Sequence, residues 1–357
     1  MWCAHIRRRT PTVKTAVITR LLRQASGGRT EDLLVPGSRH YVPHMTEPKR
    51  RVGVDVGGTK IEAVVLAPDG TEIVRQRVAT PRGYDESIEA ITELVASVER
   101  AANGQGTVGV GIPGCIVPAT GLVKNANSVW LNGRPFARDL ADRLRRPVRM
   151  MNDANCFALS EAADGAAAGA QVVFGVILGT GVGGGIVVGR ECLVGANSLA
   201  GEWGHNPLPW MTRDEYPGPS CYCGRCGCIE AWLSGPGMAQ DHARRTGETI
   251  GMHDIVEAAA AGDTRTGSTM RLYFDRLARA LASLMNVLDP DVIVLGGGMS
   301  NVPELLDRVT ENLPRYIFDA GSIDTVLATR IVRAVHGDSS GVRGAARLWD
   351  STQFVQS

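Results

Sequence analysis

The chain has 357 residues, of which 44% are hydrophobic, so it can form a large core and more than one domain. Its formal net charge is +1, but residues 1–50 carry ten Lys or Arg against three Asp or Glu, and the other 307 residues carry 28 against 34. An acidic main body argues against nucleic-acid binding, and no hydrophobic run reaches the roughly 18 residues that span a membrane. The N-terminus also lacks a secretory signal pattern, so we expect a soluble, cytoplasmic protein.

Residues 1–48 are rich in Arg, Thr, Gly and Pro and show no sustained apolar period. A segment of this composition buries too little apolar surface to offset the entropy lost on ordering. We therefore predict a disordered basic extension here, with the ordered part of the chain beginning near Arg51.

The first ordered half opens with three short apolar runs separated by Gly-containing turns, a pattern that predicts an antiparallel meander. A helical period, two further strands and a second helix follow. The predicted strands are 52–56, 61–66, 73–78, 107–112 and 148–151, and the predicted helices are 87–101 and a stretch through Ala158 and Glu161.

The second half starts in the same way, with a hairpin whose tip is rich in Gly and Thr, and we interpret this as an internal architectural repeat. Two βββαβ-type lobes of this kind predict an α/β protein of the actin-like ATPase (ribonuclease H-like) fold, with a nucleotide bound between the lobes. The predicted elements are strands 172–178, 183–188 and 292–295 and helices 268–288 and 341–348. The predicted domains are 49–165, completed by a C-terminal helix at 340–357, and 166–339.

Three glycine-rich turns follow predicted strands, and each is a candidate for nucleotide binding. Glycines let the backbone approach a phosphate and offer N–H donors, while an acid beside them can hold Mg²⁺ through water. Taken singly, each turn is equally consistent with an ordinary hairpin or strand-to-helix connection. The predicted ATP-binding residues are Asp55, Gly57, Gly58, Thr59, Lys60, Gly179, Thr180, Gly181, Gly183, Gly184, Gly185, Gly296, Gly297 and Gly298.

Asp153 follows the predicted strand 148–151 and is the candidate general base. A sugar hydroxyl is a poor nucleophile, so a carboxylate must accept its proton during attack on a γ-phosphate. An equally simple interpretation is that Asp153 caps the helix that begins near Asn155.

Four cysteines, Cys221, Cys223, Cys226 and Cys228, lie close together after His205. Three thiolates and one imidazole can form a tetrahedral zinc site that folds a loop with little core of its own. Unbound or redox-active thiols, or an iron–sulfur cluster, are the alternatives. One cysteine is surplus if His205 is a ligand, and the spacing does not decide which.

Together these stretches resemble the ROK family of bacterial kinases and repressors, from about Arg51 to the C-terminus. The strings that carry the resemblance are 55–60, 179–186, 201–205 and the C-x-C-G-x-x-G-C-x-E pattern at 221–230. The resemblance implies a structural Zn²⁺ held by His205, Cys221, Cys223 and Cys228, leaving Cys226 in a variable position. It also implies Asp153 as the base, with a sugar contacted by Asn127, Asn152, Asp153, Glu202, His205 and Glu230.

The stretches 124–133 and 204–210 look most like bacterial fructokinases that also accept mannose, so we predict ATP-dependent phosphorylation of D-fructose to fructose 6-phosphate. The alternatives within the family are a glucokinase or a kinase of N-acetylmannosamine or N-acetylglucosamine. A sugar-responsive repressor is the alternative of another class, but 48 residues are short for a winged helix-turn-helix. Family habit also suggests a homodimer.

Overall fold

The computed structural model describes residues 50–318 and 327–350. The predicted extension at 1–48 lies outside the described residues, as does the end of the predicted 340–357 helix after residue 350. Within the described part, no helix is both long and apolar enough to cross a membrane.

Two five-stranded sheets repeat one design. The first has the order β3-β2-β1-β4-β7, and the second has the order β10-β9-β8-β11-β12. In each sheet the first three strands pair antiparallel and the last two join in parallel. The strands are β1 (Arg51–Val56), β2 (Lys60–Leu66), β3 (Glu72–Ala79), β4 (Thr107–Ile112), β7 (Val148–Asn152), β8 (Val172–Leu178), β9 (Val182–Val188), β10 (Glu191–Cys192), β11 (Val292–Gly296) and β12 (Arg330–Arg333), with a separate hairpin of β5 (Cys115–Ile116) and β6 (Val123–Lys124).

Helices cover both faces of each sheet. One face of the first sheet packs on α2 and α3, and one face of the second sheet packs on the group from α5 to α9. The helices are α2 (Tyr84–Ala101), α3 (Phe136–Leu144), α4 (Asp153–Asp164), α5 (Ile229–Leu233), α6 (Gly235–Thr246), α7 (Met252–Ala260), α8 (Thr264–Leu288), α9 (Leu305–Asn312) and α10 (Ser340–Ala346), and short 3₁₀ turns include η1 (Val129–Leu131), η2 (Trp203–His205), η3 (Gly298–Asn301) and η6 (Arg347–Asp350).

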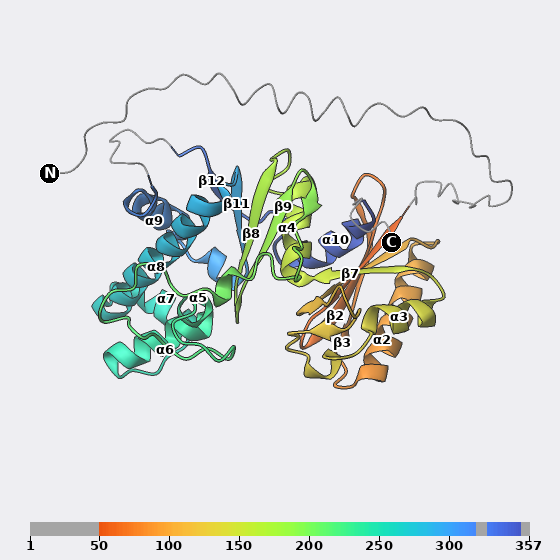
Figure 1. The fold of residues 1–357 in the computed structure, drawn as a ribbon, viewed down its shortest axis with the longest axis horizontal. Coiled ribbons are helices and arrows are strands. Elements are labelled where there is room, and N and C mark those ends of the chain that lie inside the picture. The colour runs from red at the N-terminus through yellow and green to blue at the C-terminus, as the bar shows by residue number, and fades with distance from the viewer. Residues whose placement is uncertain (1–49, 319–326, 351–357) are drawn as a thin grey trace, which may run out of the picture. The chain divides into compact units, whose positions relative to one another are not determined.

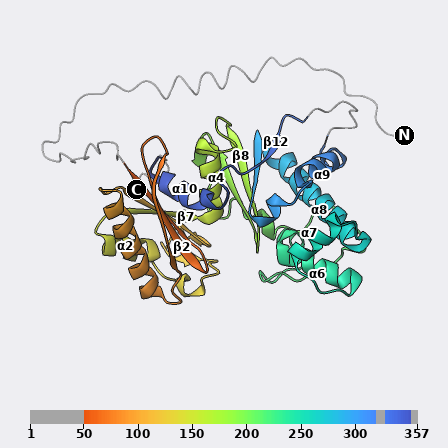
Figure 2. The same cartoon turned by 180° about the vertical axis from the view of Figure 1, so that it is seen from behind.

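The helices α4 and α10 lie between the two sheets, as Figures 1 and 2 show from opposite sides. Their packing is exchanged: α4 follows the first sheet but contacts β8 and β9 of the second, whereas α10 follows the second sheet but contacts β1 and β4 of the first. The two helices approach very closely because Gly344 has no side chain, and a Cβ there would overlap the backbone carbonyl of Cys156. This exchange ties the two sheets together.

The duplicated strand order confirms the predicted actin-like ATPase fold and the repeat on which that prediction was based. The domain boundaries remain a prediction. The helix α10 contacts the first sheet, whereas α4, which the prediction assigns to the N-terminal lobe, packs on the second.

Candidate active site and metal centre

The first turn of α4 presents Asp153. The preceding residue, Asn152, ends β7 and caps the helix, because its Oδ1 accepts hydrogen bonds from the N–H groups of Ala154 (2.9 Å) and Asn155 (3.3 Å). The Asn152 amide also donates to the carbonyl of Gly114 at 3.0 Å. Asp153 is the first helical residue, and its Oδ1 accepts from the Ala154 N–H at 2.8 Å. Since Asn152 supplies the cap, capping does not by itself account for the carboxyl group of Asp153.

Three acids share the electrostatic environment around this helix terminus. The pKa of Asp153 is raised to about 6, mainly because the protein packed around the carboxyl group removes it from water and also because of the charge of Glu202, which together outweigh the lowering effect of hydrogen bonds from backbone N–H groups and Asn152. Burial likewise raises the pKa of Asp55 to about 7, with added contributions from Asp153 and Glu62. Asp55 comes from β1 and Glu202 immediately precedes η2, so the fold brings together acids from both halves of the chain.

Two of the predicted glycine turns are tight hairpin tips. In the β1–β2 turn, the N–H of Gly57 donates to the carbonyl of Lys60 at 3.0 Å, and the residues from Gly58 to Lys60 are exposed. In the β8–β9 turn, the N–H of Gly179 donates to the carbonyl of Gly181 at 2.9 Å, and Thr180 is exposed. The backbones of both tips are therefore accessible to a ligand.

The third glycine turn, between β11 and η3, adjoins the second. Gly297 has a φ of +79° and packs so closely on the carbonyl of Leu178, at the end of β8, that a side chain would not fit. Gly298 is exposed, and a Cβ there would meet no protein atom within 4 Å. The structure thus brings the second and third predicted turns side by side.

The predicted ATP-binding glycines 183–185 are positioned differently from the others. They lie within strand β9 rather than in the turn. A Cβ on Gly184 would collide with Trp203 and Gly201, and one on Gly185 would collide with Ala154 of α4. Close packing accounts for these two glycines, so the case for nucleotide contact at this hairpin rests on residues 179–181.

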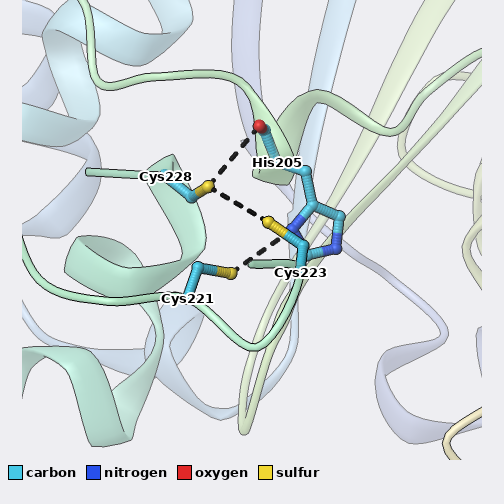
Figure 3. A group of neighbouring side chains, drawn as sticks. All are labelled: His205, Cys221, Cys223 and Cys228. Atoms are coloured by element: carbon cyan, nitrogen blue, oxygen red, sulfur yellow. Dashed lines mark hydrogen bonds between the residues drawn. The ribbon is translucent and has the colours of Figure 1, made fainter. Parts of the chain in front are cut away.

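His205, Cys221, Cys223 and Cys228 form a compact cluster, shown in Figure 3, with all four ligand atoms within 4.8 Å of one another. The Sγ of Cys221 lies 3.6 Å from Nδ1 of His205, and the Sγ atoms of Cys223 and Cys228 are 3.6 Å apart. Tetrahedral zinc with Zn–S of 2.3 Å and Zn–N near 2.05 Å requires ligand separations of about 3.8 Å for S···S and about 3.6 Å for S···N. The cluster therefore fits a four-coordinate metal ion.

Cys226 lies outside this cluster. Its side chain is exposed, and its Sγ is 4.0 Å from the hydroxyl of Ser220. The structure thus selects three of the four clustered cysteines, as the family resemblance implies.

Tyr222, which the sequence reasoning missed, lies against the ligand histidine. Its hydroxyl is 3.1 Å from Nε2 of His205, and the two rings meet edge to face. Burial raises the pKa of Tyr222, and the charges of Glu230 and Glu202 add to this effect, which places both acids near its hydroxyl. A position between two metal ligands was the signal in the sequence that could have identified Tyr222.

Two further residues predicted to contact the sugar are Glu230 and Asn127. Glu230, in α5, accepts a hydrogen bond at Oε2 from the N–H of Val182 in the β8–β9 hairpin (2.8 Å). Asn127 is exposed in the segment after β6, and this segment packs on Gly114, whose carbonyl accepts the bond from Asn152. Among the described residues no hydrogen bond joins Asn127 to Asp153, so the assignment of Asn127 to the sugar rests on the sequence.

A pocket of about 540 Å³ lies elsewhere, between α7, α8 and α9. It is lined by residues such as Met270, Phe274 and Glu304, and none of the predicted site residues lines it. The candidate site is therefore defined by converging functional groups and not by this pocket.

Comparison with known proteins decides the family, since the model of the ROK family matches residues 51–352. The chain belongs to the ROK family. An N-acetyl-D-glucosamine kinase of Escherichia coli O1:K1 is 40% identical over 302 residues, which cover 83% of this chain and 98% of that relative. The prediction of ROK membership is thus confirmed.

Solved structures of ROK proteins support the same family assignment. A ROK hexokinase from Thermus thermophilus superposes with a TM-score of 0.73 at 32% identity, covering 83% of this chain and 96% of that one. A ROK family glucokinase from Streptomyces griseus, solved in complex with glucose and AMPPNP, superposes with a TM-score of 0.68 at 30% identity, covering 84% and 98%. These relatives do not single out fructose, so the fructokinase subtype stays a prediction.

Proposed function

We propose that this ROK protein is a sugar kinase that transfers the γ-phosphoryl group of ATP to the 6-hydroxyl of a free hexose. The observation that carries the proposal is the carboxyl group of Asp153, held at the start of α4 beside Asp55 and Glu202. With a pKa of about 6, this group is mostly ionised at neutral pH and is basic enough to accept the hydroxyl proton. Positioning and charge stabilisation supply most of the remaining catalysis in phosphoryl transfer.

Asp55 is the proposed residue for the Mg²⁺ that accompanies ATP. Its pKa is raised to about 7 by burial and by the acids Asp153 and Glu62, which outweigh the lowering effect of Lys60, so the surroundings of Asp55 carry a deficit of positive charge. This deficit fits a divalent cation, and a bound Mg²⁺ would supply charge that neutralises the phosphates. The β1–β2 and β8–β9 turns would donate backbone N–H groups to the phosphates, and the turn at 296–298 would lie against the adenosine.

N-acetyl-D-glucosamine is the sugar we propose first, because the relative with 40% identity over nearly its whole length is a kinase of that sugar. Fructose stays the alternative that the stretches 124–133 and 204–210 favour. The proposed sugar contacts are Asn127, Asn152, Asp153, Glu202, His205 and Glu230. Of these, Asn152 uses Oδ1 for the helix cap and donates from its amide to the carbonyl of Gly114, and the same amide also hydrogen-bonds the carboxyl group of Asp153.

Zn²⁺ is the metal we propose for the cluster of His205 and the three cysteines. One imidazole and three thiolates are a donor set that zinc prefers, and the separations suit tetrahedral geometry. The Nδ1 of His205 faces the sulfur ligands, while Nε2 faces a hydroxyl, at present that of Tyr222. Metal binding would thus fix the tautomer and orientation with which His205 meets a sugar hydroxyl.

The proposal is tested by measuring ADP release, with a coupled assay, from the full-length protein with N-acetylglucosamine, N-acetylmannosamine, fructose, mannose and glucose. We expect the highest kcat/KM with N-acetylglucosamine, and a kcat/KM highest for fructose would favour the sequence-based alternative. If none of these sugars causes the protein to release ADP, the kinase proposal is contradicted. Sugar-dependent DNA binding by the same protein would then support the repressor alternative, whose DNA-binding unit would have to lie before residue 50.

The pKa of Asp153 predicts the acid limb of the pH–rate profile. Because the base must be ionised, kcat/KM for the sugar should be constant near pH 8 and fall about tenfold per pH unit below about pH 6. A pH profile at saturating Mg·ATP checks this expectation. A limb near pH 4, the value of an unperturbed aspartate, would contradict the assignment.

A further inference from the structure

Glu230 connects the metal loop to the second glycine turn. It lies two residues after the ligand Cys228, in the first turn of α5. Its Oε2 accepts a 2.8 Å hydrogen bond from the N–H of Val182, the residue at which β9 begins. A Cβ on Gly181 would lie 2.7 Å from the same oxygen, so glycine at 181 is what lets the carboxylate reach the turn.

The same segment holds the other end of the turn. The N–H of Gly235, at the start of α6, donates to the carbonyl of Gly179 at 2.9 Å. Ser234 joins the two contacts, since its N–H donates to the carbonyl of Glu230 at 3.0 Å and its hydroxyl caps α6. The turn from Gly179 to Val182 is therefore clamped at both ends by residues 230–235.

Holding the turn at both ends reduces its conformational freedom before a ligand binds. A Gly-Thr-Gly tip has many accessible backbone conformations, and ordering it on binding would cost affinity. Backbone N–H groups stabilise a phosphate best when they are already oriented toward it. A carboxylate bound to the N–H of Val182 fixes where the neighbouring N–H groups point.

We propose that Glu230 is a positioning residue for the nucleotide phosphates and couples sugar binding to nucleotide binding. This inference rests on the proposed kinase function and deepens it. One carboxylate oxygen, Oε2, accepts the hydrogen bond that holds the β8–β9 turn. The other oxygen, Oε1, accepts a hydrogen bond from a sugar hydroxyl when the sugar is bound. A bound sugar fixes the carboxylate and thereby the turn, so each substrate raises the affinity for the other by the same factor.

The test compares Glu230→Ala, Glu230→Gln and Gly181→Ala with the wild type, using Glu257→Ala, at an exposed glutamate of α7, as the control. Calorimetry measures the Kd for AMPPNP with and without sugar, steady-state assays give KM and kcat, and bound metal is quantified. We expect Glu230→Ala to raise the Kd for AMPPNP about tenfold and to abolish the effect of sugar on it, with metal content unchanged. Gly181→Ala should reproduce the loss of nucleotide affinity, because its methyl group displaces the carboxylate.

Rescue by Gln separates positioning from a merely structural role. The amide oxygen of Gln can still accept from Val182, so Glu230→Gln should bind AMPPNP within about threefold of the wild type while its sugar KM stays raised. Wild-type nucleotide affinity in Glu230→Ala would overturn the inference, and so would equal losses in the Ala and Gln variants accompanied by loss of metal. Neither result contradicts the kinase proposal, because that proposal is contradicted only if the wild type releases ADP with none of the sugars.

Discussion

Asp153→Asn should lower kcat by about 10²- to 10⁴-fold, the usual contribution of a general base, while sugar affinity changes little. The substitution keeps the shape of the side chain and the hydrogen bond accepted from the Ala154 N–H, but it removes the group that takes the hydroxyl proton. Steady-state kinetics give kcat, and calorimetry gives the Kd for the sugar. The matched control is Asp142→Asn, the same change at an exposed residue of α3, which should leave kcat unchanged.

Thermal unfolding distinguishes this loss of activity from misfolding. The folded-state pKa of Asp153, about 6, lies above its unfolded value of 3.8, so the wild type loses stability as the pH rises between these values. A neutral Asn removes this penalty. Asp153→Asn should therefore show a Tm higher than that of the wild type by about 2 °C or more at pH 8, and no gain at pH 4. A kcat near that of the wild type would refute the role of Asp153 as the base.

The repeated hairpins were predictable because they depend on local patterns. Two apolar runs and one alternating stretch, bounded by Gly or Pro-Asp-Gly turns, predict β1, β2 and β3, and the stretch 107–112 predicts β4 at the bounds observed. A position just after a strand also singled out Asp153 as a candidate, although it did not distinguish a general base from a helix cap. These signals lie within a few residues of the feature they predict.

Features that depend on distant contacts were not predictable. The exchange of α4 and α10 between the sheets depends on packing such as that of Gly344 on Cys156, nearly 190 residues away in sequence, which no local pattern encodes. The predicted elements also omit α6, although Ser234 caps this helix and Pro236 occupies its first turn. The glycines of β9 were predicted to bind ATP, but Gly184 and Gly185 are explained by close packing. A string of glycines in the sequence does not distinguish these two roles.

The proposed metal centre should affect sugar binding, whereas Asp153 should affect turnover. Cys223→Ser removes one of four ligands, and metal binding contributes directly to the folding of such a loop. We expect bound metal to fall from about one ion per chain to near zero, and the sugar KM to rise about tenfold or more as His205 loses its orientation. Metal analysis and steady-state kinetics check both, and chelation of the wild type should reproduce them.

Cys226→Ser is the matched control, because this exposed cysteine lies outside the cluster and its loss should change neither metal content nor sugar KM. Hydrogen exchange should further localise the damage in Cys223→Ser. The segment around Glu215 is anchored independently by buried ion pairs with Arg276 and Arg279 of α8, whereas residues 220–228 would depend on the proposed metal and on isolated bridges. Protection should therefore fall in 220–230 and persist near 215. An unchanged sugar KM in protein verified to be free of metal would end the argument that the metal orients His205.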